Sequence, residues 1–328
     1  MPNHRERILQ AAGEAARILD RFPLGRRTSF DIVRAVTELG FPVMFRPTID
    51  LLGATITVGE DSKGILVTTK RNLSIQRFTL AHELGHIILG HKMRFHLMDY
   101  EEDRLVSGGS NLQEENAADE FASGLLASRQ HISKIAREQS WDISRIGDPA
   151  TLYQLSLRLG ISFKAACWAL ARNNMISAES ARRISAGTEV RQLKTALASP
   201  HSITDPWADV WRLTDGDVGC ILECGPNDLL AINVKDNTSS GFLWEFDESV
   251  QDFEVVIEKI DIVETYGADN SRLLILRGKS LGNHRLTLEH KRPWNGEQLS
   301  SIDISIVNFG KEANGLPRQV KQEMLLAR

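Results

Sequence analysis

His82, Glu83 and His86 form the pattern H-E-x-x-H within an apolar stretch, residues 78–89. If this stretch is helical, both histidines lie on one face, where their imidazole nitrogens can bind one tetrahedral Zn²⁺. We expect the Glu83 carboxylate to reach a metal-bound water without ligating the metal. These polar groups would be costly to bury in an apolar helix without a partner. The motif therefore predicts a zinc hydrolase site with one Zn²⁺ per chain.

A third ligand decides the class of zinc site, because a catalytic zinc normally takes three protein ligands and a water. In the metzincin pattern a third histidine stands six residues after the second, and Lys92 occupies that position. His91 lies one position short and is expected to support the site or end the helix. The remaining option is a gluzincin-like site, in which a later helix supplies a glutamate.

The segment 112–126 is expected to be that helix. It offers these carboxylates: Glu114, Glu115, Asp119 and Glu120. Glu115 precedes Ala118 by three residues and Ala122 by seven, so it shares their inward face. Asp119, one turn later, could accept the free N–H of His82 or His86 and fix its tautomer. The alternative for Glu115 is an acid favoured by the dipole near a helix N-terminus.

The oxyanion of a hydrolysis reaction would need a further donor, and the sequence does not rank the candidates. They are His96, Tyr100 and His131.

The elements around the motif indicate an α+β, zincin-like domain. Helical periodicity predicts helices over residues 4–19 and 30–39. Short β-branched runs at 43–45, 53–58 and 64–68 predict a small mixed sheet. The helix that carries the H-E-x-x-H motif, called the metal helix below, follows this sheet. The polar stretch 92–111 is expected to be a loop.

A helix-turn-helix-like module is predicted at residues 151–176, where two helical runs are separated at 159–162. Its second helix offers Lys164, Arg172 and Asn173 as contacts to DNA. The same helix is core-like, however, and carries few basic residues. A structural or protein-docking role is therefore preferred to DNA binding. A charged, helix-prone segment and a polar, proline-containing stretch follow as a linker.

After residue 200 the pattern becomes strand-rich. The expected strands are residues 218–224, 229–234, 254–260, 272–276, 285–290 and 302–307. Short strands at this spacing predict an all-β, immunoglobulin-like sandwich. The fold class is thus multidomain, with the peptidase domain first, the helical module second and the sandwich third.

The composition of the chain limits the number of domains, the partners and the cellular location that we expect. The chain has 328 residues, which favours two or three domains. Its 39 basic and 43 acidic residues give a net charge of −4, so no global field attracts nucleic acid or a membrane. The 3 cysteines form no disulfide framework, and no signal or membrane-spanning segment is evident. We therefore expect a cytoplasmic location.

Two stretches resemble the ImmA/IrrE family of zinc metallopeptidases: Q-R-F-T-L-A-H-E-L-G-H at residues 76–86 and E-N-A-A-D-E-F-A-S-G-L-L at 115–126. The resemblance extends over about residues 30–180 and implies that Glu115 is the third ligand. It departs at Ala127 and Ser128, where family members often have Met-Pro. The implied substrate is a helix-turn-helix repressor or antitoxin encoded nearby, cleaved in stress, mobile-element or phage-defence control.

Two further stretches, residues 237–244 and 291–294, resemble the loop signatures of chagasin-like cysteine-protease inhibitors. The partner-binding residues that this implies are Asn237, Gly241, Trp244, Arg292, Pro293 and Trp294. Thr238 and Phe242 replace the family's Pro and Tyr, and residues 267–270 replace a Gly-rich loop. Because these changes restrict the loops, partner binding is preferred to protease inhibition.

The boundaries that follow are 1–130 for the zinc peptidase domain, 131–200 for the helical module and linker, 201–310 for the chagasin-like sandwich, and 311–328 for a tail. The predicted function is a zinc endopeptidase acting on a regulatory protein, with Glu83 as general base and then acid. One alternative is a DNA-binding or protein-binding regulator with a non-catalytic metal site. The other is a cysteine-protease inhibitor that acts through the sandwich.

Overall fold

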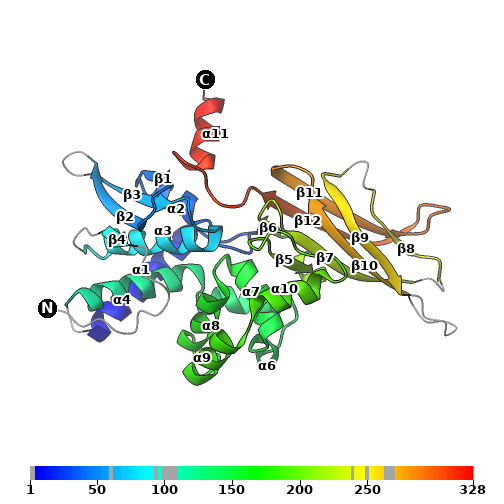
Figure 1. Ribbon diagram of the computed structural model, residues 1–328, viewed down its shortest axis with the longest axis horizontal. Coiled ribbons are helices and arrows are strands. Elements are labelled where there is room, and N and C mark those ends of the chain that lie inside the picture. The colour runs from blue at the N-terminus through cyan, green and yellow to red at the C-terminus, as the bar shows by residue number, and fades with distance from the viewer. Residues whose placement is uncertain are drawn as a thin grey trace.

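The computed structural model describes residues 4–58, 62–91, 95–97, 110–237, 240–247, 251–261 and 270–327. Figure 1 shows helices and a small sheet at one end, a helical layer in the middle and a β-rich region at the other end. The helices are α1 (His4–Arg21), α2 (Ile32–Glu38), α3 (Leu73–Ile88), α4 (Ser110–Leu126), α5 (Arg129–Glu138), α6 (Ile143–Ile146), α7 (Pro149–Leu159), α8 (Phe163–Arg172), α9 (Ala178–Gly187), α10 (Val190–Ala198), the short 3-10 helix η1 (Asp215–Asp217) and α11 (Arg318–Leu326).

Within the part of the chain that the structure describes, three sheets accompany these helices. The strands are β1 (Val43–Arg46), β2 (Leu51–Val58), β3 (Ser62–Thr68), β4 (Phe95–Leu97), β5 (Val210–Leu213), β6 (Ile221–Cys224), β7 (Leu229–Asp236), β8 (Leu243–Glu245), β9 (Phe253–Asp261), β10 (Asn270–Gly278), β11 (Gly282–Lys291) and β12 (Gln298–Asn308). The first sheet has the order β1-β3-β2-β4 and is mixed, because β1 and β3 are parallel while the other pairs are antiparallel. The expected small mixed sheet is therefore present.

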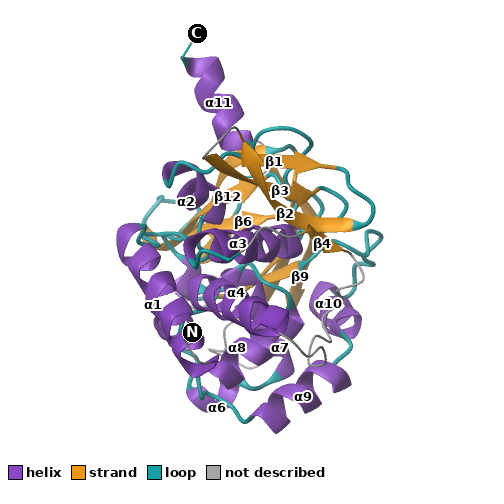
Figure 2. Cartoon of the chain, turned by 90° about the vertical axis from the view of Figure 1, so that its left-hand side faces the viewer, coloured by secondary structure: helices purple, strands orange, loops and turns teal. Residues whose placement is uncertain are grey.

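Helix α3 lies against this sheet and α4, as Figure 2 shows. It begins after Asn72, whose side chain accepts a hydrogen bond from the amide of Ile75, and ends before Gly90, which has a φ of +69°. Residues on every face of α3 are buried, which is typical of a helix in the middle of a core. Helix α3 therefore holds His82, Glu83 and His86 in the interior of the protein.

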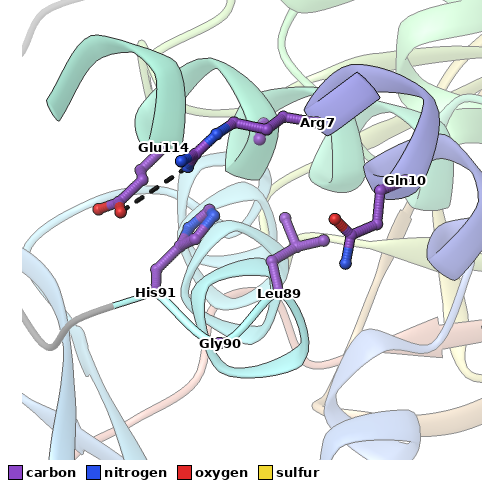
Figure 3. A pocket seen from close by; sticks show the side chains of 7 residues that line it. Arg7, Gln10, Leu89, Gly90, His91 and Glu114 are labelled. Atoms are coloured by element: carbon purple, nitrogen blue, oxygen red, sulfur yellow. Dashed lines mark ion pairs between the residues drawn. The ribbon is translucent and has the colours of Figure 1, made fainter. Parts of the chain in front are cut away.

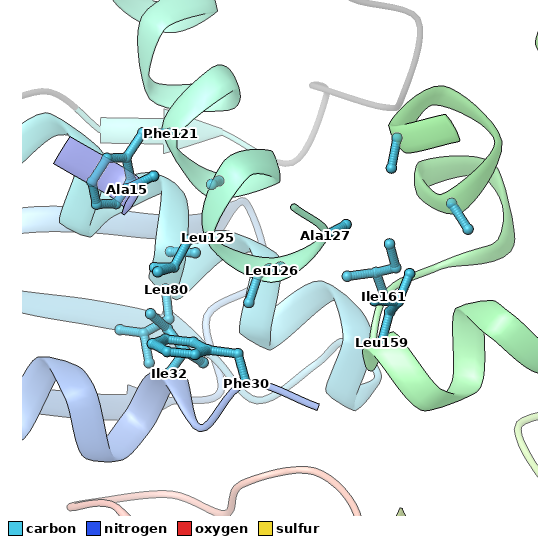
Figure 4. Packing of buried hydrophobic residues seen from close by; sticks show 14 of the residues in the cluster. Ala15, Phe30, Ile32, Leu80, Phe121, Leu125, Leu126, Ala127, Leu159 and Ile161 are labelled. Carbon is cyan, nitrogen blue, oxygen red and sulfur yellow. The ribbon is translucent and has the colours of Figure 1, made fainter. Parts of the chain in front are cut away.

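A single hydrophobic cluster joins the N-terminal helices to the helical middle of the chain. Phe30, Leu80 and Leu126 lie in it together with Leu159 and Ile161 from the end of α7 and the turn after it (Figure 4). The α7–α8 pair therefore packs on the metal-site region.

The β-rich region contains two four-stranded sheets, with the orders β5-β7-β10-β9 and β6-β12-β11-β8. One buried cluster takes residues from both, including Leu230 and Leu276 from the first sheet and Leu286 and Ile304 from the second. The six expected strands are all present, but β5 and β8 were not predicted. Each is short, and neither shows an apolar alternation long enough to read from sequence.

The stretch expected to be a loop, residues 92–111, is described at residues 95–97 and 110–111. Residues 110 and 111 already belong to α4, and residues 95–97 contradict the expectation. Strand β4 lies there and pairs with β2. A strand of this length carries too little periodicity to be recognised, and its pairing partner defines it.

The β-rich region is joined to the rest of the chain by polar contacts. Arg158 on α7 and Asp217 in η1 form an ion pair of 2.6 Å in which both side chains are 0% exposed. Gln154 on α7 uses its amide to bond the backbone of β5, donating to the Val210 carbonyl and accepting from the Arg212 amide. The edge of β5 is thus satisfied by helix side chains rather than by another strand.

The chain also crosses between the two ends at two other places. Residues 26–28 run beside β6, where the Thr28 amide donates to the Ile221 carbonyl. After β12 the chain returns to the first sheet, where Phe45 and Gly315 exchange two backbone hydrogen bonds of 2.8 Å. Within the described residues, no helix has the length and apolar character needed to cross a membrane.

Candidate metal centre

A close approach of α3 and α4 brings the ligand candidates together. A Cβ atom on Gly85 would lie 3.0 Å from the Phe121 ring and 3.3 Å from the Cα atom of Ala118. Glycine at this position therefore lets the two helix backbones come near each other. The next inward residue of α4, one turn before Ala118, is Glu115, which consequently faces the histidines of α3.

The three candidate ligand atoms form a compact triangle. The Nε2 atoms of His82 and His86 are 3.0 Å apart, and the Oε2 atom of Glu115 lies 3.3 Å from the first and 3.7 Å from the second. Tetrahedral zinc with bonds of roughly 2.0–2.2 Å needs ligand atoms about 3.3–3.6 Å apart. The spacing and the donor set therefore fit one metal ion.

Each histidine has a partner on its second ring nitrogen. His82 Nδ1 lies 2.8 Å from the Oδ1 atom of Asp119, and His86 Nδ1 lies 3.0 Å from Nδ1 of His91. In the tautomer that directs the Nε2 lone pair to a metal, both Nδ1–H groups donate to these partners. Burial lowers the pKa of His91 to about 4, so its imidazole is neutral and can accept. Asp119 thus contacts one of the two histidines that its helical phase placed within its reach, His82.

The charges around His82 favour a cation. Burial by itself lowers the pKa of His82, but hydrogen bonds to Asp119 and Glu115 outweigh it and raise the pKa to about 10. Burial, together with the neighbouring His82, lowers the pKa of His86. Two carboxylates therefore hold a positive charge at this place, which a proton or a metal ion can supply.

Glu83 is held by the first sheet. Its side chain is 0% exposed, and its Oε2 atom accepts a hydrogen bond of 3.0 Å from the Thr55 hydroxyl on β2. A Cβ on Gly53 would lie 3.1 Å from the other carboxylate oxygen and 2.4 Å from a methyl group of Thr79. Glycine thus allows β2 to approach this turn of the helix. The sequence alone did not single out Gly53 and Thr55. A glycine within the strand before the motif was nevertheless a signal that another element packs closely against that strand.

The other carboxylates of α4 have different partners. Glu114 Oε1 lies 3.8 Å from Arg7 Nη1, and Glu120 pairs with Arg172 at 2.9 Å. Glu114 and Arg7 line a depression of about 210 Å³ beside the metal centre (Figure 3). The remaining lining residues are Gln10, Leu89, Gly90, His91 and Ala117.

Of the oxyanion candidates, only His131 has a described side chain. Its Nε2 atom lies 2.6 Å from the Thr28 carbonyl oxygen, and burial lowers its pKa to about 4. This contact assigns His131 to the packing of α5 rather than to the triad. The side chain of His96 and the whole of Tyr100 lie outside the described residues.

With this geometry in view, residues 37–171 match the model of the peptidase M78 family, the IrrE N-terminal-like domain. This part of the chain is similar to an IrrE N-terminal-like domain. The predicted resemblance is confirmed there, and the family supports a metallopeptidase-type function. The matched segment contains all three residues of the triad. Among curated proteins, no sequence matches the chain.

Solved structures similar to the C-terminal region include two proteins. The cysteine protease inhibitor EhICP2 from Entamoeba histolytica is 24% identical over 32% of this chain and 99% of its own, with a TM-score of 0.28. Amebosin is 17% identical over 30% of this chain and 97% of its own, with a TM-score of 0.25. At these scores neither similarity bears on what the region does.

Two loops at the far end of the β-rich region lie against each other. Gly241 has a φ of +77°, and a Cβ there would lie 2.0 Å from the ring of Trp294, so only glycine fits beneath this ring. Arg292 donates from Nε to the Ser240 carbonyl at 3.1 Å and lies 4.4 Å from the centre of the Phe242 ring. The structure thus brings Gly241, Arg292 and Trp294 together.

The other residues predicted to bind a partner differ in how far they are exposed. Trp244 is 8% exposed and stacks on His290 in the core, whereas Trp294 is 69% exposed. The Asn237 carbonyl accepts from the amides of Ser240 and Phe242 and so closes the turn. Pro293 is exposed. Thr238 and residues 267–269 lie outside the described residues, and Asn270 begins β10.

The candidate DNA contacts on α8 are engaged within the chain. Arg172 pairs with Glu120, and the Asn173 side-chain amide donates to the Ala127 carbonyl at 3.1 Å. Lys164 also has a partner. These contacts attach α8 to α4 and the turn that follows it.

Proposed function

We propose that this protein is a zinc-dependent, gluzincin-like endopeptidase. The observation that carries the proposal is the buried triangle of His82, His86 and Glu115. Glu83 lies beside it, on the helix that carries the two histidines. Two histidine nitrogens and one carboxylate are a catalytic donor set for Zn²⁺, which leaves the fourth position for water.

The chemistry follows from the position of each group. Zn²⁺, when bound by the triad, supplies a Lewis acid that polarises the scissile carbonyl and lowers the pKa of water toward ~7. Glu83 accepts the proton of the attacking water and delivers it to the leaving amine. Thr55 holds the Glu83 carboxylate, and Asp119 and His91 orient the two imidazoles. Peptide-bond hydrolysis is the reaction that these roles support.

As substrate we propose a helix-turn-helix repressor or antitoxin encoded next to this chain, so that its cleavage switches on a stress, mobile-element or phage-defence programme. The likeness of residues 76–86 and 115–126 to ImmA/IrrE peptidases supports this proposal. We also propose a cytoplasmic location, which agrees with the three free cysteines, all buried.

Co-expression tests activity and substrate together. The wild type should cleave the neighbouring regulator, whereas Glu83→Gln should reduce the cleavage rate by about 10²–10⁴-fold and still contain one zinc ion. Glu120→Gln on α4 is a matched control, since this carboxylate pairs with Arg172 outside the triad, and it should cleave like the wild type. Wild-type cleavage by Glu83→Gln, or a purified wild type without zinc, would show that the enzyme proposal is wrong.

A second function is proposed for the loops around Trp294. An indole that is 69% exposed, on a turn fixed by Gly241 and Arg292, is typical of a protein contact. We propose that an immunoglobulin-like sandwich presents these loops to a partner protein, and that the α7–α8 pair is a helix-turn-helix-like docking module. Micromolar inhibition of papain by the full chain, abolished by Trp294→Ala, would instead establish the cysteine-protease inhibitor alternative.

The DNA-binding alternative has less support. Two of the three candidate DNA contacts, Arg172 at the end of α8 and Asn173 just after it, are already paired with α4 and the turn that follows it. Salt-dependent binding of the purified chain to duplex DNA, lost in Lys164→Ala, would favour it.

A further inference from the structure

Arg77 connects three regions of the chain at the first half of the metal helix. Its side chain is 6% exposed, and its Nη2 atom donates to Ser29 Oγ at 2.9 Å and to Glu223 Oε2 on β6 at 2.7 Å. A Cβ on Gly160, in the turn between α7 and α8, would lie 2.3 Å from its Nη1 atom. One guanidinium group thus touches the N-terminal segment, the helical pair and the β-rich region.

The neighbouring residue of α3 makes a second connection to the C-terminal part. The Gln76 side chain is buried, and its Oε1 atom accepts from the backbone amide of Glu312 at 2.8 Å. Its Nε2 atom donates to the Thr68 carbonyl at 3.0 Å. Two consecutive residues of the metal helix are therefore fixed by residues more than 140 positions away along the chain.

These contacts lie close to the metal centre. Arg77 precedes His82 by five residues, which is about 7.5 Å along a helix axis. A helix moves as a rigid rod over such a length, so a shift at Arg77 moves the His82 imidazole and the Glu83 carboxylate as well. Catalytic and metal-binding groups lose much of their effect when displaced by about 1 Å.

The charge of this pair makes its loss costly. The Arg77 side chain is only 6% exposed, so water compensates poorly for the loss of Glu223, and its other described acceptors, Ser29 Oγ and the Phe30 carbonyl, are neutral. We propose that Arg77 and Glu223 are a positioning pair, through which the β-rich region fixes the place of the metal helix and so tunes the triad. This inference rests on the proposed metal function and gives the C-terminal region a role in it.

The test uses the full chain, freed of metal and titrated with Co²⁺ as the probe. Glu223→Gln should raise the Co²⁺ dissociation constant about threefold, less than the roughly 10–100-fold that follows loss of a group hydrogen-bonded to a metal ligand, and change the visible spectrum of the bound ion. Ser29→Ala removes a weaker contact of the same guanidinium and should shift both readouts less. Glu254→Gln breaks a more exposed ion pair with Arg277 on the other sheet and should leave both unchanged.

Wild-type affinity and spectrum in Glu223→Gln would overturn the positioning role. If the wild type itself binds no Co²⁺, the proposed enzyme function fails, and hydrogen exchange then decides the inference separately. The amides of α3 should exchange at least about tenfold faster in Glu223→Gln than in Glu254→Gln if the pair positions the helix. Equal exchange in the two variants would contradict it.

Discussion

The metal centre and the Trp294 loops present opposite ways of arranging functional groups. In the metal centre, every ligand candidate is at most 8% exposed and the second nitrogen of each histidine has a partner. At the loops, the most prominent side chain is 69% exposed and lies on turns rather than on helices or central strands. Chemistry on a bond requires fixed groups, whereas recognition of a partner requires groups that remain accessible.

The two regions lie toward opposite ends of the molecule in Figure 1, with the α7–α8 pair and the first strands of the β-rich region between them. The connection is buried and polar, as the Arg158–Asp217 pair illustrates. If the two regions differ in this way, substitutions in the buried networks should strongly lower stability or metal affinity. Substitutions at the loops should change stability little.

Asp217→Asn should have a large effect on stability. It leaves the guanidinium of Arg158 buried without its charge partner, and breaking such a pair costs about 3–5 kcal/mol. Urea unfolding followed by circular dichroism measures this loss. Arg285→Gln, which breaks the exposed Arg285–Asp303 pair, is the control and should not move the midpoint. Equal midpoints for both variants would end the distinction between the buried junction and the surface.

A second buried carboxylate predicts a pH dependence. Burial and the neighbouring Asp209 raise the pKa of Asp228 to about 6. A carboxyl group with a raised folded-state pKa stabilises the protein when protonated, so its contribution is complete below about pH 4 and disappears as the pH rises through about 6. The free energy of unfolding should therefore fall by on the order of 2–3 kcal/mol over this range from Asp228 alone.

Unfolding of the metal-free chain at several pH values measures that term as the difference between wild type and Asp228→Asn. The variant should be less stable overall, because its single amide oxygen cannot replace both Oδ1, which accepts from the Asp209 amide, and Oδ2, which accepts from Trp211 and the Gly225 amide. Parallel stability curves for the two proteins between pH 4 and 7 would contradict the assignment.

Asp119→Ala should weaken metal binding and leave the fold intact. The variant removes the carboxylate that accepts from the Nδ1–H group of His82 and fixes its tautomer, and loss of such partners typically lowers metal affinity by about 10–100-fold. Competition with a chelator measures the change. Glu120→Ala, on the next position of α4, is the matched control and should retain wild-type affinity.

The sequence predicted that His82, His86 and Glu115 come together because this grouping depends on spacing within helices. His82 and His86 share a face for reasons of helical geometry alone, and the apolar neighbours of Glu115 fix its phase. Thr55 and Gly53 were missed because their contacts with Glu83 arise from the packing of β2 on α3, which no local pattern encodes.

Long-range connections were the least predictable. Nothing near Arg77 in the sequence indicates Glu223, and the pairing of Phe45 with Gly315 depends on how the end of the chain returns to the first sheet. The same limit applies to strands β5 and β8, which are defined by their partners. Periodicity reports which face of an element is buried, and it does not report what covers that face.

The two tryptophans of the loop region give the finest test of the comparison. Trp244→Ala should cost about 3–5 kcal/mol, because its indole is buried and stacked on His290. Trp294→Ala should change stability by less than about 0.5 kcal/mol, since most of its ring already contacts water. Urea unfolding of both variants measures the difference. If Trp294→Ala proves as destabilising as Trp244→Ala, the indole of Trp294 is a structural cover for Gly241, and its proposed role in partner binding loses its main support.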